Sequence, residues 1–454
     1  MSDRASLTGR YLDTVTRRGA GQRELIGPLP GSDLLNALYR GRFLSRPVFT
    51  GAAERAALHA DLDNIRTALA SLPGRRFGGD LAAFARAAGL TGVQADAVQR
   101  SRSTTVTALT RADLYTDGDG FRLLELNMGS AIGGIDNADL CRGLLAHPVL
   151  AGFAAEHGLG YVDTMAEQVA TIFAETGAEP GSVPVIALAD WPGHYAAFSP
   201  YLHKLAVRWR ALGLDARPCH VGELEAGRGP VRLRGERVDI IFRLFLIEHL
   251  LEPDGPALIG PVLAAAERGA VAMFTPLDTE LYGSKAALAM LGDEQGRALC
   301  TASERASLDR ILPWTRLVAP GPARLPGGGQ GDLIEYAVTA QRDLVLKPAL
   351  LGGGRGVVLG DSPGCGPAQW RDQLAAAARE PYVIQQRIRP EPELFPGPDG
   401  ALVPWVVTWG PFTLGCGFGG IYTRAVPAAS PAGAINRHSG AHVGSGLSAG
   451  LSAA

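Results

Sequence analysis

The sequence predicts a mixed α/β fold of two or three domains, and three observations lead to this prediction. Residues 1–105 carry apolar side chains at helical spacing. From Val183 onward, apolar strands alternate with helices, as they do in a small open α/β unit. Two further pairs of strands, within residues 112–127 and 343–360, are each joined by a glycine-containing turn. A chain of 454 residues, 46% of them hydrophobic, can bury the cores of such domains.

Charge and cysteine content exclude several classes of protein. Lys and Arg number 43 against 45 Asp and Glu, and no basic stripe indicates a nucleic-acid partner. The five cysteines form no CxxC pair, so neither a disulfide framework nor a zinc site is expected. The N-terminus lacks the apolar core of a signal peptide, and no apolar run approaches the ~18 residues of a membrane span. We therefore expect a cytoplasmic protein without membrane or nucleic-acid partners; its oligomeric state is not indicated.

The N-terminal segment, residues 1–105, is predicted to be mainly helical. Apolar residues at helical spacing mark helices at Glu54–Leu72 and Gly79–Ala97, with Pro73-Gly74 between them as a stop. This segment carries no residues that indicate chemistry. We expect it to contribute packing alone.

Residues 181–270 are predicted to form the small α/β domain. The run VPVIALADW, which starts at Val183, is nearly continuous in apolar residues, as a buried parallel strand is. A second apolar strand ends at Arg243, which would place a cation at the carboxyl edge of the sheet; an arginine in a surface salt bridge is the alternative. At the other end of the chain, the Gly/Ser-rich tail 446–454 is predicted to be disordered.

The most informative stretch lies in residues 106–180. It predicts strands Ala112–Tyr115 and Phe121–Asn127, joined by the turn-forming run Asp-Gly-Asp-Gly at 117–120. Side chains alternate faces along a strand, so Arg111 and Asp113 share one face, as do Glu125 and Asn127.

If this hairpin closes symmetrically, Asp113 lies opposite Glu125, and Arg111 lies opposite Asn127. Like charges across a strand pair are destabilising. Two carboxylates and an amide oxygen on one face therefore indicate a cation, and oxygen ligands suit Mg²⁺. An exposed hairpin with a solvated acidic face is the alternative.

Two lysines in residues 271–445 are candidates for phosphate binding. Lys285 follows Ser284, a candidate cap, in the first turn of a helix, where the helix dipole does not favour a lysine. Lys347 precedes a glycine-rich turn between two strands, which excludes the Walker A order. Such a turn can close over phosphates while the strand lysine pairs with their charge. A surface lysine and an ordinary glycine hairpin are the alternatives.

These motifs together resemble those of circularly permuted ATP-grasp ligases. The resemblance consists of Lys285, the strand with Lys347 and its glycine turn, the strand YVIQQRI at 382–388, and the Arg-x-Asp…Glu-x-Asn hairpin. In the usual ATP-grasp order the metal-binding strand comes last, whereas here Glu125 precedes Lys347. This order is similar to that of the glutathionylspermidine synthetase-like ligases and of the permuted ATP-grasp proteins of actinobacteria. The resemblance to these families covers about half of the chain.

The resemblance implies a fold, cofactors and residue roles. The fold would be a circularly permuted ATP-grasp fold with a metal-binding lobe at 106–180, a small α/β domain at 181–270 and a nucleotide-binding lobe at 271–445. ATP and Mg²⁺ would be the cofactors. Lys285 and Lys347 would bind phosphates, and Arg111 would stabilise the transferring phosphoryl group. The glycine turn would close over the γ-phosphate through Gly352, Gly353, Gly354 and Gly356, and Asp113, Glu125 and Asn127 would hold Mg²⁺.

One departure from the family concerns the strand that would contact adenine. Gln385 stands at the expected hinge position, but Gln386 replaces the acidic residue that commonly follows, which puts a ribose contact in doubt. No cysteine amidase domain is present, so a bifunctional synthetase–amidase is not supported.

The function implied is ATP-dependent ligation of a small-molecule carboxylate to an amine through an acyl phosphate. The family resemblance also implies that this reaction forms a peptide bond in specialised metabolism. Two alternatives stay open. The same site could serve a phosphotransferase acting on a hydroxyl group, or a non-catalytic nucleotide-binding protein.

Overall fold

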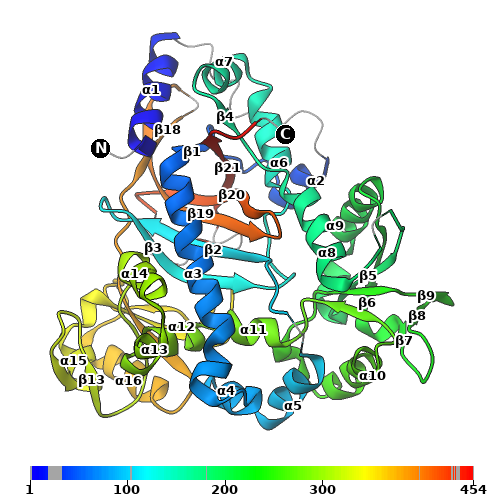
Figure 1. Cartoon of the computed structure of the whole chain (residues 1–454). Coiled ribbons are helices and arrows are strands. Elements are labelled where there is room, and N and C mark those ends of the chain that lie inside the picture. The colour runs from blue at the N-terminus through cyan, green and yellow to red at the C-terminus, as the bar shows by residue number, and fades with distance from the viewer. Residues whose placement is uncertain are drawn as a thin grey trace.

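The computed structural model describes residues 3–18, 33–102, 105–179, 181–397, 399–430, 433, 435 and 440–452. Its mixed α/β architecture has three sheet-containing parts, which Figure 1 shows as a central sheet, a lower left lobe and a right-hand lobe. The predicted α/β fold class is thus confirmed. In none of the described parts of the chain does a helix have the length and apolar character needed to cross a membrane.

The central sheet has the order β1-β21-β20-β19-β2-β3 among the described residues, with β18 beside β19 and β4 beside β21. Among the strands that the structure describes, β1 and β21 pair in parallel and the other neighbours pair antiparallel. The strands are β1 (Val48–Thr50), β2 (Thr110–Thr116), β3 (Phe121–Met128), β4 (Leu159–Gly160), β18 (Glu393–Pro396), β19 (Leu402–Leu414), β20 (Gly417–Pro427) and β21 (His442–Ala449). The predicted hairpin, β2–β3, therefore forms one end of a sheet whose longest other strands, β19, β20 and β21, come from the C-terminal part of the chain.

The prediction of a disordered tail at 446–454 is wrong for the residues that the structure describes. Strand β21 continues to Ala449, pairs with β20 and β1, and is buried along most of its length. Small residues are what this position requires: a Cβ on Gly446 would lie 2.8 Å from the Ile421 side chain. The small residues of β21 give it the composition of a disordered tail. In the structure they allow neighbouring strands to pack closely.

Most helices from the first half of the chain lie around the central sheet, and two of them, at residues 81–87 and 92–101, lie below it in Figure 1. The helices are α1 (Asp3–Arg18), α2 (Asp33–Tyr39), α3 (Ala52–Phe77), α4 (Leu81–Ala87), α5 (Gly92–Ser101), α6 (Asn137–Leu145), α7 (Pro148–Glu156) and α8 (Thr164–Thr176). Figure 1 shows α3 crossing in front of the central sheet to reach the lower left lobe. Residues 1–105 are mainly helical where the structure describes them, as predicted, but they do not contribute packing alone, because Tyr39 and Gln94 line the large cavity described below.

The predicted stop at Pro73-Gly74 is wrong, because α3 runs through Pro73 to Phe77. A proline removes one helical hydrogen bond, but contacts beyond it hold the last turn in place. Arg75 pairs with Glu304, and Arg76 pairs with Asp293, both in the lower left lobe. The long helix thereby ties this lobe to the central sheet.

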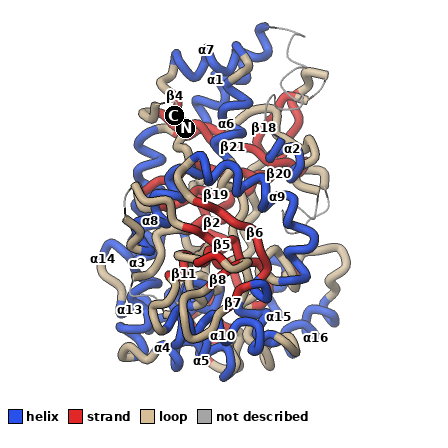
Figure 2. The backbone as a smooth tube through the Cα atoms, turned by 90° about the vertical axis from the view of Figure 1, so that its right-hand side faces the viewer, coloured by secondary structure: helices blue, strands red, loops and turns tan. Residues whose placement is uncertain are grey.

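The right-hand lobe contains a parallel sheet in the order β11-β10-β5-β6. Its elements are β5 (Val185–Asp190), α9 (Pro192–Ala211), β6 (Asp215–His220), the short helix η2 (Val221–Glu223), β10 (Ile240–Arg243), the short helix η3 (Ile247–Leu251), α10 (Gly255–Glu267) and β11 (Ala272–Phe274), with a small sheet of β7 (Leu224–Glu225), β8 (Arg232–Leu233) and β9 (Glu236–Arg237). In the side view of Figure 2, β5 and β11 lie below the central-sheet strands β19 and β20.

The lower left lobe contains an antiparallel sheet in the order β12-β17-β15-β16. Helix α11 (Asp278–Tyr282) connects the right-hand lobe to this one. The elements of the lower left lobe are α12 (Lys285–Gly292), α13 (Glu294–Leu299), α14 (Ala302–Ile311), β12 (Thr315–Leu317), β13 (Pro322–Arg324), β14 (Gln330–Asp332), α15 (Leu333–Thr339), η4 (Gln341–Asp343), β15 (Leu344–Pro348), β16 (Val358–Leu359), α16 (Pro367–Ala377) and β17 (Tyr382–Gln386). The predicted strand–glycine turn–strand motif is β15–β16, which shares its sheet with YVIQQ of β17.

The C-terminal strand should contribute substantially to stability. Leu447 is 0% exposed and packs in a cluster with Tyr11 and Phe49. Leu447→Ala is expected to lower the free energy of unfolding by about 2–5 kcal/mol, because it leaves a cavity in that cluster. Chemical denaturation measures the loss, and Leu394→Ala, at an exposed position of β18, is the control. Equal stability of the two variants would contradict an ordered, packed β21.

Candidate functional site

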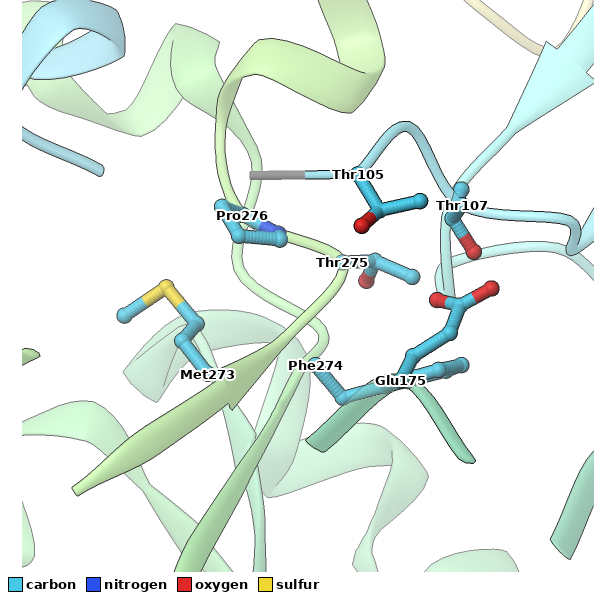
Figure 3. A pocket seen from close by; sticks show the side chains of 7 residues that line it. All are labelled: Thr105, Thr107, Glu175, Met273, Phe274, Thr275 and Pro276. Carbon is cyan, nitrogen blue, oxygen red and sulfur yellow. The ribbon is translucent and has the colours of Figure 1, made fainter. Parts of the chain in front are cut away.

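A cavity of about 990 Å³ lies where the three parts of the protein meet. The β2–β3 hairpin, α12, β15, the glycine turn and β17 line one portion of it, and α9 and η3 line another. All of the predicted site residues except Gly356 line this cavity. A second cavity, of about 40 Å³, lies beside β11, where Figure 3 shows Glu175 pointing toward Thr107. It has room for on the order of one or two water molecules.

The register of the β2–β3 hairpin is the one predicted. Asp113 pairs with Glu125, and Arg111 pairs with Asn127. The pairing shifts by one residue directly after Asp113. This irregularity lies toward the turn, so it leaves the four side chains in the expected relation. A slip by one residue at the other end would have turned the set to the opposite face.

The charge of Asp113 is balanced by two arginines. Its carboxylate pairs with Arg111 at 3.0 Å and with Arg424 of β20 at 2.6 Å. Burial opposes ionisation, but the two guanidinium groups outweigh it and hold the pKa of Asp113 below its ordinary value. Side chains of this chain therefore supply the positive charge beside Asp113, and its role as a Mg²⁺ ligand stays a prediction.

Sequence reasoning missed Arg424. It lies about 300 residues from Asp113 in the sequence, and only the strand order β20-β19-β2 brings the two together. Its single sequence signal is a charged residue in the otherwise apolar strand IYTRAV. That pattern does not identify a partner.

Glu125 is held by Lys285, the first residue of α12. The Lys285 ammonium lies 2.9 Å from the Glu125 carboxylate and donates to the carbonyl oxygen of Leu351. Ser284 caps the helix by accepting from the Ala287 N–H, as the sequence predicted. The lysine thus bridges the hairpin and the segment that leads into the glycine turn.

Lys347 reaches the same hairpin from β15. Its ammonium donates to the Leu124 carbonyl oxygen at 3.1 Å and to Gln385 Oε1 at 2.5 Å. Burial lowers the pKa of Lys347 to about 8, against the opposing charge of Glu125. The two predicted phosphate-binding lysines therefore converge on consecutive residues of β3.

The glutamines of β17 have different surroundings. Gln385 is buried and also donates to the Thr315 hydroxyl, which fixes its amide with the oxygen toward Lys347. Gln386 also lines the cavity, but unlike Gln385 it is exposed to solvent. Their roles at adenine and ribose stay predictions.

The glycine turn has the backbone that its composition predicted. Gly353, Gly354 and Gly356 have φ of 65°, 75° and 70°, a region in which only glycine lies without strain. A Cβ on Gly356 would lie 2.7 Å from Pro348, so this glycine serves the packing of the turn against β15. Within the turn, Arg355 extends to Glu248 of η3, with contacts of 2.8 and 3.0 Å.

The hairpin offers a partial set of ligands for Mg²⁺. Among the described residues, no group of three or more His, Cys, Asp or Glu could hold a metal ion. Both carboxylate oxygens of Asp113 are bound by arginine side chains. Glu125 keeps a carboxylate near the cavity, and Asn127 donates from its amide nitrogen to the Arg111 carbonyl, which leaves its oxygen as an acceptor. One carboxylate and one amide oxygen fit Mg²⁺ that is otherwise bound by phosphates and water.

Comparisons with known proteins identify a structural likeness but no sequence family. No family model and no curated protein matches the sequence. The structure is similar to a glutathione synthetase-like effector (GSS30) from Globodera pallida in its apo form, at 13% identity and a TM-score of 0.58 over 98% of both chains. A candidate gamma-glutamylcysteine synthetase from Methylobacillus flagellatus KT has 12% identity and a TM-score of 0.44 over 87% of this chain and 88% of its own. The chain has the ATP-grasp-like fold of the glutathione synthetase type.

The structure predicts that Asp113 is needed for stability. Asp113→Asn leaves Arg111 and Arg424 buried without a balancing charge, and should lower the free energy of unfolding by about 3–5 kcal/mol. Asp117→Asn, which breaks a more exposed pair with Arg122 in the same hairpin, should cost about 1 kcal/mol or less. Urea denaturation of both variants tests this, and equal losses would refute the buried arginine bridge.

The low pKa of Lys347 predicts a pH-dependent stability. At neutral pH the lysine is charged in both the folded and the unfolded chain, so the folded protein carries the full cost of burying the charge. Between pH 8 and its ordinary pKa of 10.5, the folded protein loses the proton first. Wild type should therefore gain about 3 kcal/mol relative to Lys347→Met as pH rises through this interval.

Denaturation at neutral pH and at about pH 10 measures this gain. Lys204→Met, at an exposed position of α9, is the control and should show no comparable change. A constant difference between wild type and Lys347→Met would show that the ammonium is solvated.

Proposed function

We propose that this protein is an ATP-dependent ligase that joins a small-molecule carboxylate to an amine through an acyl phosphate. The observation that carries the proposal is the meeting of Lys285 and Lys347 on strand β3, inside a cavity of about 990 Å³. Each lysine comes from an element next to the glycine turn. An ATP-grasp-like fold supplies the context, and we infer that it is the circularly permuted form.

The nucleotide would lie between the glycine turn and the hairpin. Lys285 and Lys347 would exchange their present partners for phosphate oxygens, and the N–H groups of Gly352, Gly353 and Gly354 would face the γ-phosphate. Gln385 and Gln386 would lie toward adenine and ribose. An incoming phosphate would favour the charged form of Lys347, because it replaces neutral oxygens with an anion.

Arg111 is the residue proposed to act on the transferring group. Its guanidinium is fixed by Asp113 and by the Gly133 carbonyl oxygen at 2.7 Å. A cation held in this way needs little reorganisation when negative charge develops nearby. Asp113 is therefore proposed to position Arg111, in place of the metal-ligand role predicted for it.

Glu125 and Asn127 would hold Mg²⁺ together with the phosphates. When bound, the ion neutralises phosphate charge and orients the γ-phosphoryl group. Glu125 would leave Lys285 as the lysine moves to phosphate, so carboxylate and ammonium would each gain a new partner of opposite charge. The carboxylate substrate would attack the γ-phosphoryl group, and the amine would then displace phosphate from the acyl phosphate.

The experiment is a screen of free amino acids and dicarboxylic acids as carboxylate substrates, with ATP, Mg²⁺ and hydroxylamine. ADP together with a hydroxamate is the expected result, because hydroxylamine captures an acyl phosphate. ADP with a phosphorylated substrate and no hydroxamate would indicate a phosphotransferase. Absence of ADP with every acid would contradict a ligase and leave a nucleotide-binding role.

The proposed Mg²⁺ ligands predict selective effects on the reaction. Glu125→Gln and Asn127→Ala should each lower the rate of ADP formation about a hundredfold or more, as expected for loss of a charge-positioning group. Asp119→Asn, at the exposed turn of the same hairpin, should leave the rate unchanged. Thermal melts without metal check the fold, and normal ADP formation by Glu125→Gln would exclude the carboxylate from the metal site.

A further inference from the structure

One face of α9 lines the portion of the cavity that lies away from the two lysines. His194, Phe198, Tyr201, Leu202 and Leu205 all line it, at the spacing of one side of a helix. Four of these five side chains are apolar or aromatic. The cavity wall in this portion is therefore suited to an apolar group.

At the start of this face, a buried carboxylate orients His194. Asp190 ends β5, is 1% exposed, and accepts the Trp191 N–H at 2.8 Å through one oxygen. Its other oxygen lies 2.6 Å from His194 Nδ1. The carboxylate favours the tautomer with the proton on Nδ1, so the Nε2 atom of the neutral ring is a proton acceptor. The His194 side chain is 56% exposed and lines the cavity.

The short helix η3 connects this pair to the glycine turn. Arg355 of the turn is bound to Glu248, and the next residue, His249, stacks on Trp191 at a ring distance of 4.7 Å. His249 is also close enough to Asp190 and His194 for their charges to act on it. The Asp190–His194 pair and the glycine turn therefore both border η3, the pair through Trp191 and the turn through Arg355.

The charges of the cavity wall differ between its two portions. Arg111, Lys285 and Lys347 belong to the hairpin side. The α9 side carries the carboxylates of Asp190, Glu248 and Glu280. Its buried arginine, Arg243, is bound to Glu280 and to the carbonyl oxygens of Thr275 and Phe245. The hairpin side suits phosphates. Because Glu248 and Glu280 are paired with Arg355 and Arg243, the carboxylate of Asp190 beside His194 is what suits the α9 side to a substrate that arrives as a cation.

We propose that the α9 face is the amine-binding subsite, that it takes a primary amine with an apolar side chain, and that His194 removes a proton from this amine. The proposal rests on the ligase function proposed above. Phe198 and Leu202 would contact the apolar side chain. Asp190 acts as a positioning residue, because it orients the ring of His194 and stabilises its protonated form.

The proton transfer fits the chemistry of amide formation. The substrate ammonium gives one proton to His194 Nε2, and the free amine then attacks the carbonyl carbon of the acyl phosphate. The new C–N bond forms as the C–O bond to phosphate breaks. The second nitrogen proton leaves with the phosphate as hydrogen phosphate, and His194 returns its proton to solvent.

The role of His194 as a base is tested with two nucleophiles, leucinamide and hydroxylamine. Each reacts in turn with the carboxylate substrate that the hydroxamate screen identifies. Leucinamide keeps its proton up to a higher pH than hydroxylamine does. At a pH at which hydroxylamine is neutral and leucinamide is still largely protonated, leucinamide alone needs a base. His194→Gln should therefore lose about tenfold or more in amide formation with leucinamide, since general-base catalysis contributes on the order of a hundredfold, and should keep hydroxamate formation. His203→Gln, at an exposed position of the same helix, is the control. Equal losses with both nucleophiles, or none, would overturn the base assignment.

The side-chain preference is tested by binding, without ATP or turnover. Saturation-transfer NMR should show leucinamide bound to the wild-type protein more tightly than glycinamide. Phe198→Ala should weaken leucinamide binding about fivefold or more, because it removes apolar contact area. Val207→Ala, at a 62% exposed position of α9, should not. Unchanged binding in Phe198→Ala would overturn the subsite even if the protein proves to be a ligase, whereas leucinamide binding without ADP formation would refute the ligase alone.

Discussion

The contact between strand β3 and two lysines is the interaction on which the site depends. Lys285 and Lys347 come from separate elements of the lower left lobe, and each bonds to the hairpin of the central sheet. These bonds close one side of the cavity and hold the glycine turn near the hairpin. The long helix α3 supports the same junction from outside, through its arginine pairs with Glu304 and Asp293.

The sequence predicted the parts of this site that depend on local patterns. The strand pairs, the cap before Lys285 and the glycine turn each follow from residues within about twenty positions of one another. The hairpin register followed as well, because alternation and the turn restrict it to few choices. That the hairpin and the two lysines, which lie far apart in the sequence, meet in one cavity could be inferred only from the family resemblance.

The features that the sequence did not reveal depend on long-range packing. Arg424 neutralises Asp113 because of a strand order that no local pattern indicates. The C-terminal strand has the composition of a disordered segment, but its glycines fit between neighbouring side chains. Pro73 resembles a helix stop, and ion pairs with another lobe keep the helix intact beyond it. In each case a distant partner outweighs the local preference.

The pair between Arg355 and Glu248 differs in kind from the other ion pairs of the cavity. Its side chains are 56% and 31% exposed, whereas those of the Arg111–Asp113 pair are 8% and 6% exposed. Salt screens exposed charges much more than buried ones. Rising ionic strength therefore loosens the attachment of the glycine turn to η3 while the hairpin keeps its charge balance. Of the charges that join the elements of the cavity wall, those between the glycine turn and η3 are therefore the ones that dissolved ions reach first.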